Sequence, residues 1–252
     1  MALRDELKSQ GDWMFRWRSY LPVLILPFLF ASLINPGQPV VNPALGGSEL
    51  LERIWDWSCV ALSFAGLLLR ALIIARIPKG TSGANTVKQS AKVLNTTGMY
   101  SLCRNPLYLG NFIIFLGVAL FTGDLWFALL ASMFFWVYYE RIIYAEEEFL
   151  RGEFGEEYEA WSKKTPAFFP KLGGWTRPAL PFCLRSVLRR EFSPFFAVIA
   201  VFCFLRVAKI ALREWTVRIE FEWAVFFLAG LAVYLILMTL KTFTRLLNAE
   251  GR

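Results

Sequence analysis

Residues 98–110 read GMYSLCRNPLYLG and place charged and polar side chains directly before an apolar segment at 107–121. Pro106 fixes its own φ angle and restricts Asn105 to extended conformations, a pattern typical of the first turn of a helix. We therefore expect Arg104 and Asn105 at the mouth of a membrane helix, where backbone N–H groups and the helix dipole favour an anion such as a carboxylate. The alternative is a positively charged cytosolic flank, which is common at the ends of membrane helices.

The composition indicates an integral membrane protein. The chain has 252 residues, of which 56% are hydrophobic and 17% aromatic. Its mean hydropathy is +0.46, and the apolar residues form long blocks. The net charge of +7 lies mainly in the connecting segments, which suits contact with anionic lipid at a bilayer surface. No basic stripe alternates with aromatic residues, so no nucleic-acid partner is expected.

The chain contains no histidine, which excludes Ser-His and Cys-His nucleophile pairs and histidine acid–base chemistry. No metal is expected, because this common ligand is missing and the four cysteines form no CxxC pair. We interpret most of the cysteines as small buried hydrophobic residues. Arg104 could lower the pKa of the neighbouring Cys103 thiol, but no nearby residue would serve as its base.

The apolar blocks predict an all-α fold, a polytopic membrane helical bundle of about five to six transmembrane helices with both termini in the cytosol. Residues 1–19 mix both charges with aromatic residues and predict an amphipathic segment at the interface. Residues 35–47 are rich in proline and glycine and predict a loop. The expected spans are 20–34, 54–75, 107–121, 125–144, 195–212 and 223–240.

The C-terminal third of the chain does not obey the positive-inside rule in this topology. Four basic residues fall on the non-cytosolic side, although three glutamates lie among them: Arg206, Lys209, Arg213 and Arg218 with Glu214, Glu220 and Glu222. A re-entrant pair of helices is therefore an alternative to two spans. Residues 172–190 are rich in glycine, proline and arginine and predict a connector. We interpret its arginines as contacts to anionic lipid, namely Arg177, Arg185, Arg189 and Arg190.

Two polar segments, 98–110 and 146–170, are expected on the same cytosolic side, because the helical hairpin between them returns the chain to where it began. Arg104 and Asn105 can then meet Glu146 and its neighbour Glu147 at the mouth of two helices. A cation beside carboxylates could bind a small zwitterion, with arginine taking its carboxylate and glutamate its ammonium. The alternative is an Arg–Glu pair that only closes the hairpin.

Two spaced motifs carry a resemblance to a known family. The first is Gly98-x-Tyr100-x-x-x-Arg104-Asn105-Pro106-x-Tyr108-x-Gly110, and the second is Glu146-Glu147-x-x-Leu150-x-x-x-Phe154-Gly155-x-x-Tyr158, followed by Pro166 and Pro170. With a membrane hairpin between these motifs, residues 95–170 resemble the isoprenylcysteine carboxyl methyltransferase and phospholipid methyltransferase superfamily. One departure is Asn105, where many members have histidine. Asparagine can hydrogen-bond but cannot titrate near pH 7.

The resemblance implies an integral membrane enzyme that uses S-adenosylmethionine (SAM) as methyl donor. A membrane lipid or a prenylated substrate would enter from the bilayer, with the active site on the cytosolic side. The matching positions imply Arg104 and Glu147 as catalytic residues. The residues implied to bind the cofactor are Tyr100, Arg104, Asn105, Pro106, Tyr108, Leu109, Gly110, Glu146 and Glu147.

The resemblance also suggests a division of the chain into three parts. Residues 1–95 would form N-terminal membrane helices and a cytosolic loop, and residues 96–172 the methyltransferase core with a cytosolic cofactor-binding segment. Residues 173–252 are an extension with two further hydrophobic helices, which the resemblance does not explain. We expect the protein in a prokaryotic cytoplasmic membrane, or in the endoplasmic reticulum of a eukaryote.

The expected chemistry favours an oxyanion as methyl acceptor. A sulfonium donor carries its own activation, so the reaction needs alignment and a dry site more than proton transfer. A carboxylate or phosphate is already ionised at pH 7, whereas an amine would need a base such as Glu147. Two alternatives stay open, a membrane reductase of the sterol-reductase type that uses NADPH, and a non-catalytic lipid-binding protein on the same scaffold.

Two remaining features are interpreted as structural. The aromatic residues within 134–139 are expected to pack at the membrane interface, with a cation–π cage around the sulfonium as the alternative. After them, a short helix is expected to end near Gly155 in the soluble segment 146–170.

Overall fold

The computed structural model describes residues 3–18, 20–34, 49–78, 91–249 and 251. Within these residues the regular secondary structure is helical. The β-type pairing described there is an isolated bridge between Gly98 and Thr176. The α-helices are α1 (Leu3–Arg16), α2 (Leu26–Ile34), α3 (Glu49–Ile74), α4 (Pro106–Phe121), α5 (Leu125–Ser162), α6 (Leu184–Glu214) and α7 (Phe221–Phe243). This confirms the predicted all-α membrane bundle. The predicted loop at 35–47 lies outside the described residues.

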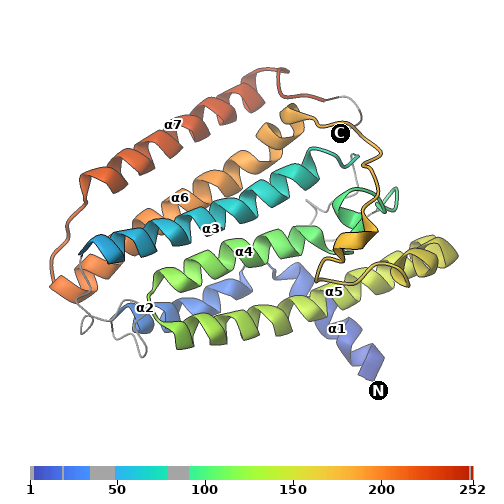
Figure 1. Ribbon diagram of the computed structural model, residues 1–252, viewed down its shortest axis with the longest axis horizontal. Helices are drawn as coiled ribbons and strands as arrows, with labels where there is room; N and C mark the ends of the chain where they lie inside the picture. Colours follow the sequence, from blue (N-terminus) through green and yellow to red (C-terminus); the bar gives the residue numbers. More distant parts are fainter. Residues whose placement is uncertain (1–2, 19, 35–48, 79–90, 250, 252) are drawn as a thin grey trace.

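Three helices, α3, α6 and α7, are long and apolar enough to cross a membrane. Figure 1 shows α4 running alongside α3 and the first part of α5 running alongside α4, with α2 at one end of the bundle. The predicted span at 20–34 is instead a 3₁₀ helix (Leu21–Ile25) followed by the nine-residue α2. Pro27 lies in the first turn of α2, where its missing N–H is tolerated, so the α-helix does not extend further back.

Two helices extend beyond the apolar segments that predicted them. α5 was expected to leave the membrane at residue 144 but continues to Ser162, and α6 begins at Leu184, within the predicted connector. Polarity marks where a helix leaves the apolar phase, whereas helical hydrogen bonding continues in water wherever residues favour it. The helix end predicted near Gly155 is a kink inside α5, where Gly155 has φ 51° and ψ −121°. Glycine adopts this positive φ at little steric cost.

The C-terminal third forms two long helices and not a re-entrant pair. α6 has 31 residues and α7 has 23, and they lie side by side in antiparallel directions (Figure 1). Their connection lies at the end of the bundle opposite the two ends of the described chain. The two ends of the described chain therefore lie at the same end of the bundle.

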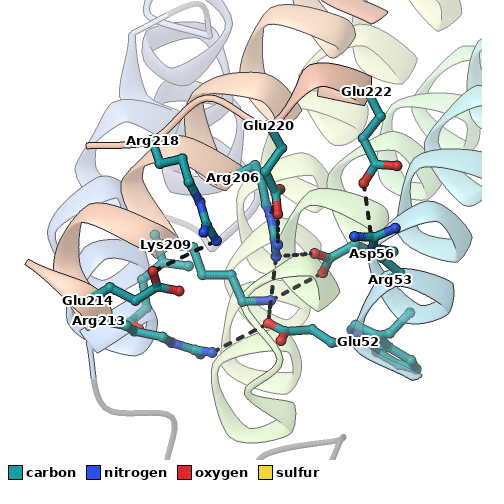
Figure 2. Close-up of polar contacts among 12 residues, drawn as sticks. Glu52, Arg53, Asp56, Arg206, Lys209, Arg213, Glu214, Arg218, Glu220 and Glu222 are labelled. Carbon is teal, nitrogen blue, oxygen red and sulfur yellow. Dashed lines mark hydrogen bonds and ion pairs between the residues drawn. The ribbon is translucent and has the colours of Figure 1, made fainter. Parts of the chain in front are cut away.

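Two of the basic residues that broke the positive-inside rule, Arg206 and Lys209, belong to an ion cluster at this connected end of α6 and α7, shown in Figure 2. Lys209 Nζ lies 2.6 Å from Glu52 Oε1 and 3.2 Å from Asp56 Oδ1. Arg206 contacts Asp56 at 2.9 Å and Glu220 at 2.7 Å. We call Glu52, Asp56, Arg206, Lys209 and Glu220 the far-end ion cluster.

The far-end ion cluster explains why cations are tolerated on this side of the membrane. The side chains of Asp56 and Lys209 are only 2% and 5% exposed, and buried charges are stable only when they are paired and hydrogen-bonded. Nearby, Arg213 donates from Nε to the Leu33 carbonyl oxygen at 3.1 Å, and Arg218 lies 3.9 Å from Glu214. Each of the four basic residues therefore has a partner in this region.

Glycines set the close approach of α3 and α4. A Cβ atom on Gly66 would lie 2.7 Å from the Gly110 carbonyl oxygen and 2.9 Å from the Ile114 nitrogen. A Cβ atom on Gly117 would lie 2.6 Å from the Cys59 carbonyl oxygen. Small residues of this kind allow the backbones of membrane helices to pack in direct contact.

We expect Gly66→Val to destabilise the protein by about 1–3 kcal/mol, because backbone atoms of α4 cannot move aside as a flexible side chain would. The matched control is Gly152→Ala in α5, where a Cβ atom would meet no atom within 4 Å. That change should be neutral or stabilising by about 0.5–1 kcal/mol, since alanine favours the helix. The free energy of unfolding in mixed micelles measures both, and equal effects would contradict this packing role.

Candidate functional site

The turn that precedes α4 is held against the segment that follows α5. The Arg104 nitrogen donates to the Pro166 carbonyl oxygen at 2.9 Å, and the Asn105 nitrogen to that of Ala167 at 3.2 Å. The Gly98 nitrogen donates to the Thr176 carbonyl oxygen at 2.9 Å, and Gly98 has a φ of 62° that favours glycine. Two segments about 60 residues apart in the sequence are thus joined backbone to backbone.

Arg104 and Glu147 form a two-pronged ion pair at this junction. Arg104 donates from Nε to Glu147 Oε1 at 2.8 Å and from Nη2 to Oε2 at 2.7 Å. Its Nη1 donates to the carbonyl oxygens of Ser162, at 3.0 Å, and Thr165, at 2.7 Å. Asn105 Nδ2 also donates to Glu147 Oε1, at 3.2 Å. Arg104 and Asn105 therefore contact Glu147, as predicted.

The contacts of Arg104 favour a role in closing the hairpin of α4 and α5 over direct recognition of a ligand. A guanidinium has five N–H donors, and four of them point to protein acceptors here. The side chains of Arg104 and Glu147 are 15% and 16% exposed, a setting in which a planar guanidinium paired with a carboxylate gives a rigid connection. The catalytic roles expected for the two residues stay a prediction.

Glu146 is positioned differently from its neighbour. Tyr108 of α4 donates from its hydroxyl to Glu146 Oε1 at 2.8 Å. Loss of surrounding water raises the pKa of Glu146 to about 7, and the nearby Glu147 adds to the effect, while the Tyr108 hydrogen bond opposes it. This carboxyl group can therefore change its charge near neutral pH.

A cavity of about 730 Å³ opens beside these residues, within the usual range of about 300–1,000 Å³ for ligand pockets. Its lining comes from α1, α3, the turn before α4, α4, α5, α6 and α7. The helix ends that supply its lining lie at the end of the bundle that holds the two ends of the described chain (Figure 1). Six of the predicted site residues line it, namely Tyr100, Arg104, Asn105, Pro106, Tyr108 and Glu146.

Three predicted site residues lie outside the lining of this cavity, Leu109, Gly110 and Glu147. The Glu147 carboxylate is instead paired with the Arg104 guanidinium. A Cβ atom on Gly110 would lie 2.6 Å from Arg70 Cγ, so glycine here lets the Arg70 side chain cross α4. Arg70 then forms a two-pronged ion pair with Glu191 of α6, at 2.7 and 2.9 Å.

The structure adds cavity residues that the sequence did not single out as cofactor or substrate ligands. They are Arg18, Arg70, Asn111, Arg189, Arg190 and Lys241 among others. Arg189 and Arg190 were interpreted as contacts to anionic lipid, but the early start of α6 brings them to the cavity. Their place at the cavity could have been predicted only by recognising that α6 begins inside the polar segment, at Leu184. The polar composition of that segment does not indicate a helix.

The aromatic residues of α5 pack mainly against other rings. Tyr139 lies 4.0 Å from Phe135 and 4.9 Å from Tyr108, measured between ring centroids. Phe135 also contacts Phe112 of α4 at 5.2 Å. This is the helix packing expected for aromatic pairs, and Tyr139 in addition lines the cavity.

Cys103 does not behave as a reactive thiol. Its side chain is fully buried, and burial raises its pKa to about 11. The expected lowering by Arg104 is wrong, because the guanidinium is directed to Glu147 and two carbonyl groups. Among the described residues, no group of three or more histidine, cysteine, aspartate or glutamate side chains could hold a metal ion.

The fold defines a helical membrane protein with a cavity at one end of its helices. A family model described as phospholipid methyltransferase matches residues 56–157. The chain is similar to the cobalt-zinc-cadmium resistance protein of Cupriavidus metallidurans, with 30% identity over 145 residues, which cover 58% of this chain and 67% of that protein. No solved structure matches the chain.

Two other relatives match similar fractions of the chain at similar identity. The protein-S-isoprenylcysteine O-methyltransferase of Schizosaccharomyces pombe is 31% identical over 127 residues, 49% of this chain and 53% of that enzyme. The nickel-cobalt-cadmium resistance protein of Alcaligenes xylosoxydans is 32% identical over 120 residues, 47% and 55% of the two chains. The chain thus spans about half to two thirds of these relatives. It belongs to the superfamily of isoprenylcysteine carboxyl and phospholipid methyltransferases.

Proposed function

We propose that the protein is a membrane methyltransferase that transfers a methyl group from SAM to the carboxylate or phosphate of a lipid-like or prenylated acceptor. The observation that carries this proposal is the cavity of about 730 Å³ on which six of the residues expected to bind the cofactor converge. It adjoins the spanning helices, so an acceptor dissolved in the bilayer can reach it without crossing bulk water. Membership of the superfamily supports the reaction type.

The cavity residues fit SAM. The cofactor has a sulfonium and an ammonium group, for which Glu146 offers a carboxylate. Tyr100, Tyr108 and Tyr139 offer aromatic surface for its adenine ring and sulfonium. Asn105 offers a neutral amide for a hydroxyl or carboxylate group. When bound, SAM supplies a methyl group on a positively charged sulfur, and the sulfur keeps the electron pair of the broken bond while an acceptor lone pair forms the new one.

The residues of this chain would then bind, align and exclude water without transferring a proton. Glu146, ionised, would attract the positive charge of the cofactor, and the Tyr108 hydroxyl would fix the direction of its carboxylate. Arg104 and Glu147 would hold the turn before α4 against α5, which keeps Tyr100 and Asn105 at the cavity wall. An ionised acceptor needs no base, in keeping with a chain that lacks histidine.

The charge distribution supports a cytosolic cavity. The far-end ion cluster pairs its cations with carboxylates, so those cations contribute little net charge at that end. At the cavity end, Arg189, Arg190 and Lys241 line the cavity, and the positive-inside rule assigns such an excess to the cytosol. The membrane would be the cytoplasmic membrane of a prokaryote or the endoplasmic reticulum of a eukaryote.

The direct test is SAM binding by calorimetry with detergent-purified protein, followed by transfer of a labelled methyl group to extracted membrane lipids. We expect SAM to bind and NADPH not to bind, and label to appear in a lipid fraction. A folded protein that binds NADPH and not SAM would replace this proposal with the reductase alternative. Binding of neither would leave the non-catalytic alternative.

We expect the affinity for SAM to rise with pH and to level off above about pH 7, because the pKa of Glu146 is raised to about 7 and the ionised form attracts the cofactor. Below that pH, binding must remove a proton from Glu146, which costs up to about tenfold in affinity per pH unit. Glu146→Gln should bind more weakly and lose this pH dependence. The matched control is Glu156→Gln, an exposed residue of the same helix. A wild-type affinity that is flat from about pH 5 to 8 would contradict this role of Glu146.

A further inference from the structure

The cavity has an excess of positive charge in its wall. Among the described residues that line it, six side chains are cationic and two carry a carboxyl group. The cationic residues are Arg18, Arg70, Arg104, Arg189, Arg190 and Lys241, and the acidic ones are Glu146 and Glu191. Arg70 is paired with Glu191 and Arg104 with Glu147. The other four cations that line the cavity are Arg18, Arg189, Arg190 and Lys241, and the last three belong to α6 and α7.

Arg189 and Lys241 bring positive charge to the cavity. Arg189 donates from Nη1 to the side-chain oxygen of Asn248 at 2.5 Å, and Lys241 Nζ lies 4.8 Å from the centre of the Phe192 ring. Both partners are uncharged, and within the described residues neither cation belongs to an ion pair. Both side chains are exposed, so an anion can reach them without a large desolvation cost.

We call Arg189 and Lys241 the basic wall of the first cavity. A second, apolar cavity of about 290 Å³ adjoins the first and lies between α3, α6 and α7. Its lining is almost wholly hydrophobic and includes Leu67 and Ala71 of α3, Phe195 of α6 and Leu237 of α7. Glu191 and Phe192 line both cavities, so the polar and the apolar cavity meet at these two residues. A site with cations on one side and hydrocarbon on the other is complementary to an anionic amphiphile.

We propose that α6 and α7 select the methyl acceptor as an anionic amphiphile. Its phosphate or carboxylate headgroup binds Arg189 and Lys241, and its hydrocarbon chain lies in the apolar cavity between α3, α6 and α7. This inference rests on the proposed function, because it assigns the substrate class of the same cavity. The two helices lie outside residues 56–157, the part of the chain that the family model matches. Selection of the acceptor is then a property of the C-terminal extension.

The test is competitive binding of amphiphiles that share one chain but differ in headgroup. Full-length protein in dodecyl maltoside, a neutral amphiphile, is titrated with dodecyl phosphate, dodecanoate or zwitterionic dodecylphosphocholine, and binding is followed by calorimetry. We expect at least one anion to bind about tenfold or more tightly than dodecylphosphocholine, since charge-assisted hydrogen bonds favour the anion. The order of phosphate and carboxylate then identifies the preferred oxyanion.

Variants separate the basic wall from general surface charge. The double variant R189Q/K241Q should lose about tenfold or more of its affinity for the anion. The matched double variant R177Q/R185Q removes two exposed arginines of the same segment that do not line the cavity, and it should bind as the wild type does. Ala71→Phe should fill the apolar cavity and weaken binding of the dodecyl chain whatever the headgroup. Equal losses in the two double variants would overturn the proposal.

SAM binding is measured in the same samples, so that the two proposals can fail independently. We expect R189Q/K241Q to retain SAM binding, because Glu146, Asn105 and the tyrosines proposed to hold the cofactor are unchanged. If SAM binds but anionic and zwitterionic amphiphiles bind equally, the acceptor inference is wrong and the methyltransferase proposal stands. If the anions bind with the predicted preference and SAM does not, the amphiphile site stands and the proposed reaction is wrong.

Discussion

Arg104→Ala is expected to lower methyl transfer by about 100-fold or more while the helical bundle stays folded. The change removes four hydrogen bonds that join the turn before α4 to Glu147, Ser162 and Thr165. It also leaves the Glu147 carboxylate, only 16% exposed, without its guanidinium. The cavity residues Tyr100 and Asn105 belong to the released turn, and displacement by about 1 Å is enough to cost about 100-fold in rate. A steady-state assay with labelled SAM measures the loss.

A matched arginine on α5 provides the control for Arg104. Arg151 also forms ion pairs, with Glu148 and with Glu159, but its side chain is 40% exposed and does not line the cavity. Arg151→Ala should change the rate by about twofold or less, because exposed ion pairs contribute about 0–1 kcal/mol. Arg104→Lys should recover only part of the activity, since an ammonium cannot form the planar two-pronged contact. Wild-type activity in Arg104→Ala would reduce this pair to helix-end architecture with no role in the reaction.

Lys209→Met is expected to destabilise the protein by about 3–5 kcal/mol, the usual cost of removing one member of a buried ion pair. The far-end ion cluster would then have Asp56, 2% exposed, facing Arg206 alone, and Glu52 would lose its contact at 2.6 Å. Unfolding of the purified protein by denaturing detergent measures the change. Methyl transfer at temperatures well below unfolding should stay near the wild-type rate, because the helix ends that carry the cluster lie at the opposite end of the bundle from those that line the cavity (Figure 1).

Two further variants show whether the cost comes from the unpaired charge. Asp56→Leu combined with Lys209→Met should recover much of the lost stability, because apolar replacement of a whole buried pair is often neutral or better. Arg218→Ala removes a nearby cation whose pair with Glu214 is 61% and 52% exposed, and it should cost less than about 1 kcal/mol. If Lys209→Met and Arg218→Ala cost the same, the far-end ion cluster does not stabilise the bundle.

Local features of the sequence determined the core of the fold. The helical hairpin of α4 and α5 follows from two apolar segments around a short turn, where Asp124 caps α5 by accepting hydrogen bonds from the backbone of Trp126 and Phe127. Such a hairpin must bring residues near its two outer ends together, so the approach of Arg104 to Glu147 was predictable. These features depend on hydrophobic length and turn chemistry, which are written in neighbouring residues.

Helix length was less predictable, for a physical reason. Apolar composition reports where a helix lies in the bilayer, and both α5 and α6 extend into the polar phase with charged residues that favour helix as much as loop. The extension of α6 is what brings Arg189 and Arg190 to the cavity. Their interpretation as lipid contacts followed from treating residues 172–190 as a connector.

By itself, the sequence determined an all-helical membrane protein of the methyltransferase superfamily, with two motifs that meet across a hairpin. Only the tertiary structure decided which distant side chains share a site. Arg206 and Lys209 find Asp56 about 150 residues away, and Lys241 reaches the same cavity as Tyr108. Contacts of this kind depend on which faces of separate helices pack together, and that choice is made by side-chain shape and charge across the whole bundle. No local pattern in the chain carries that information.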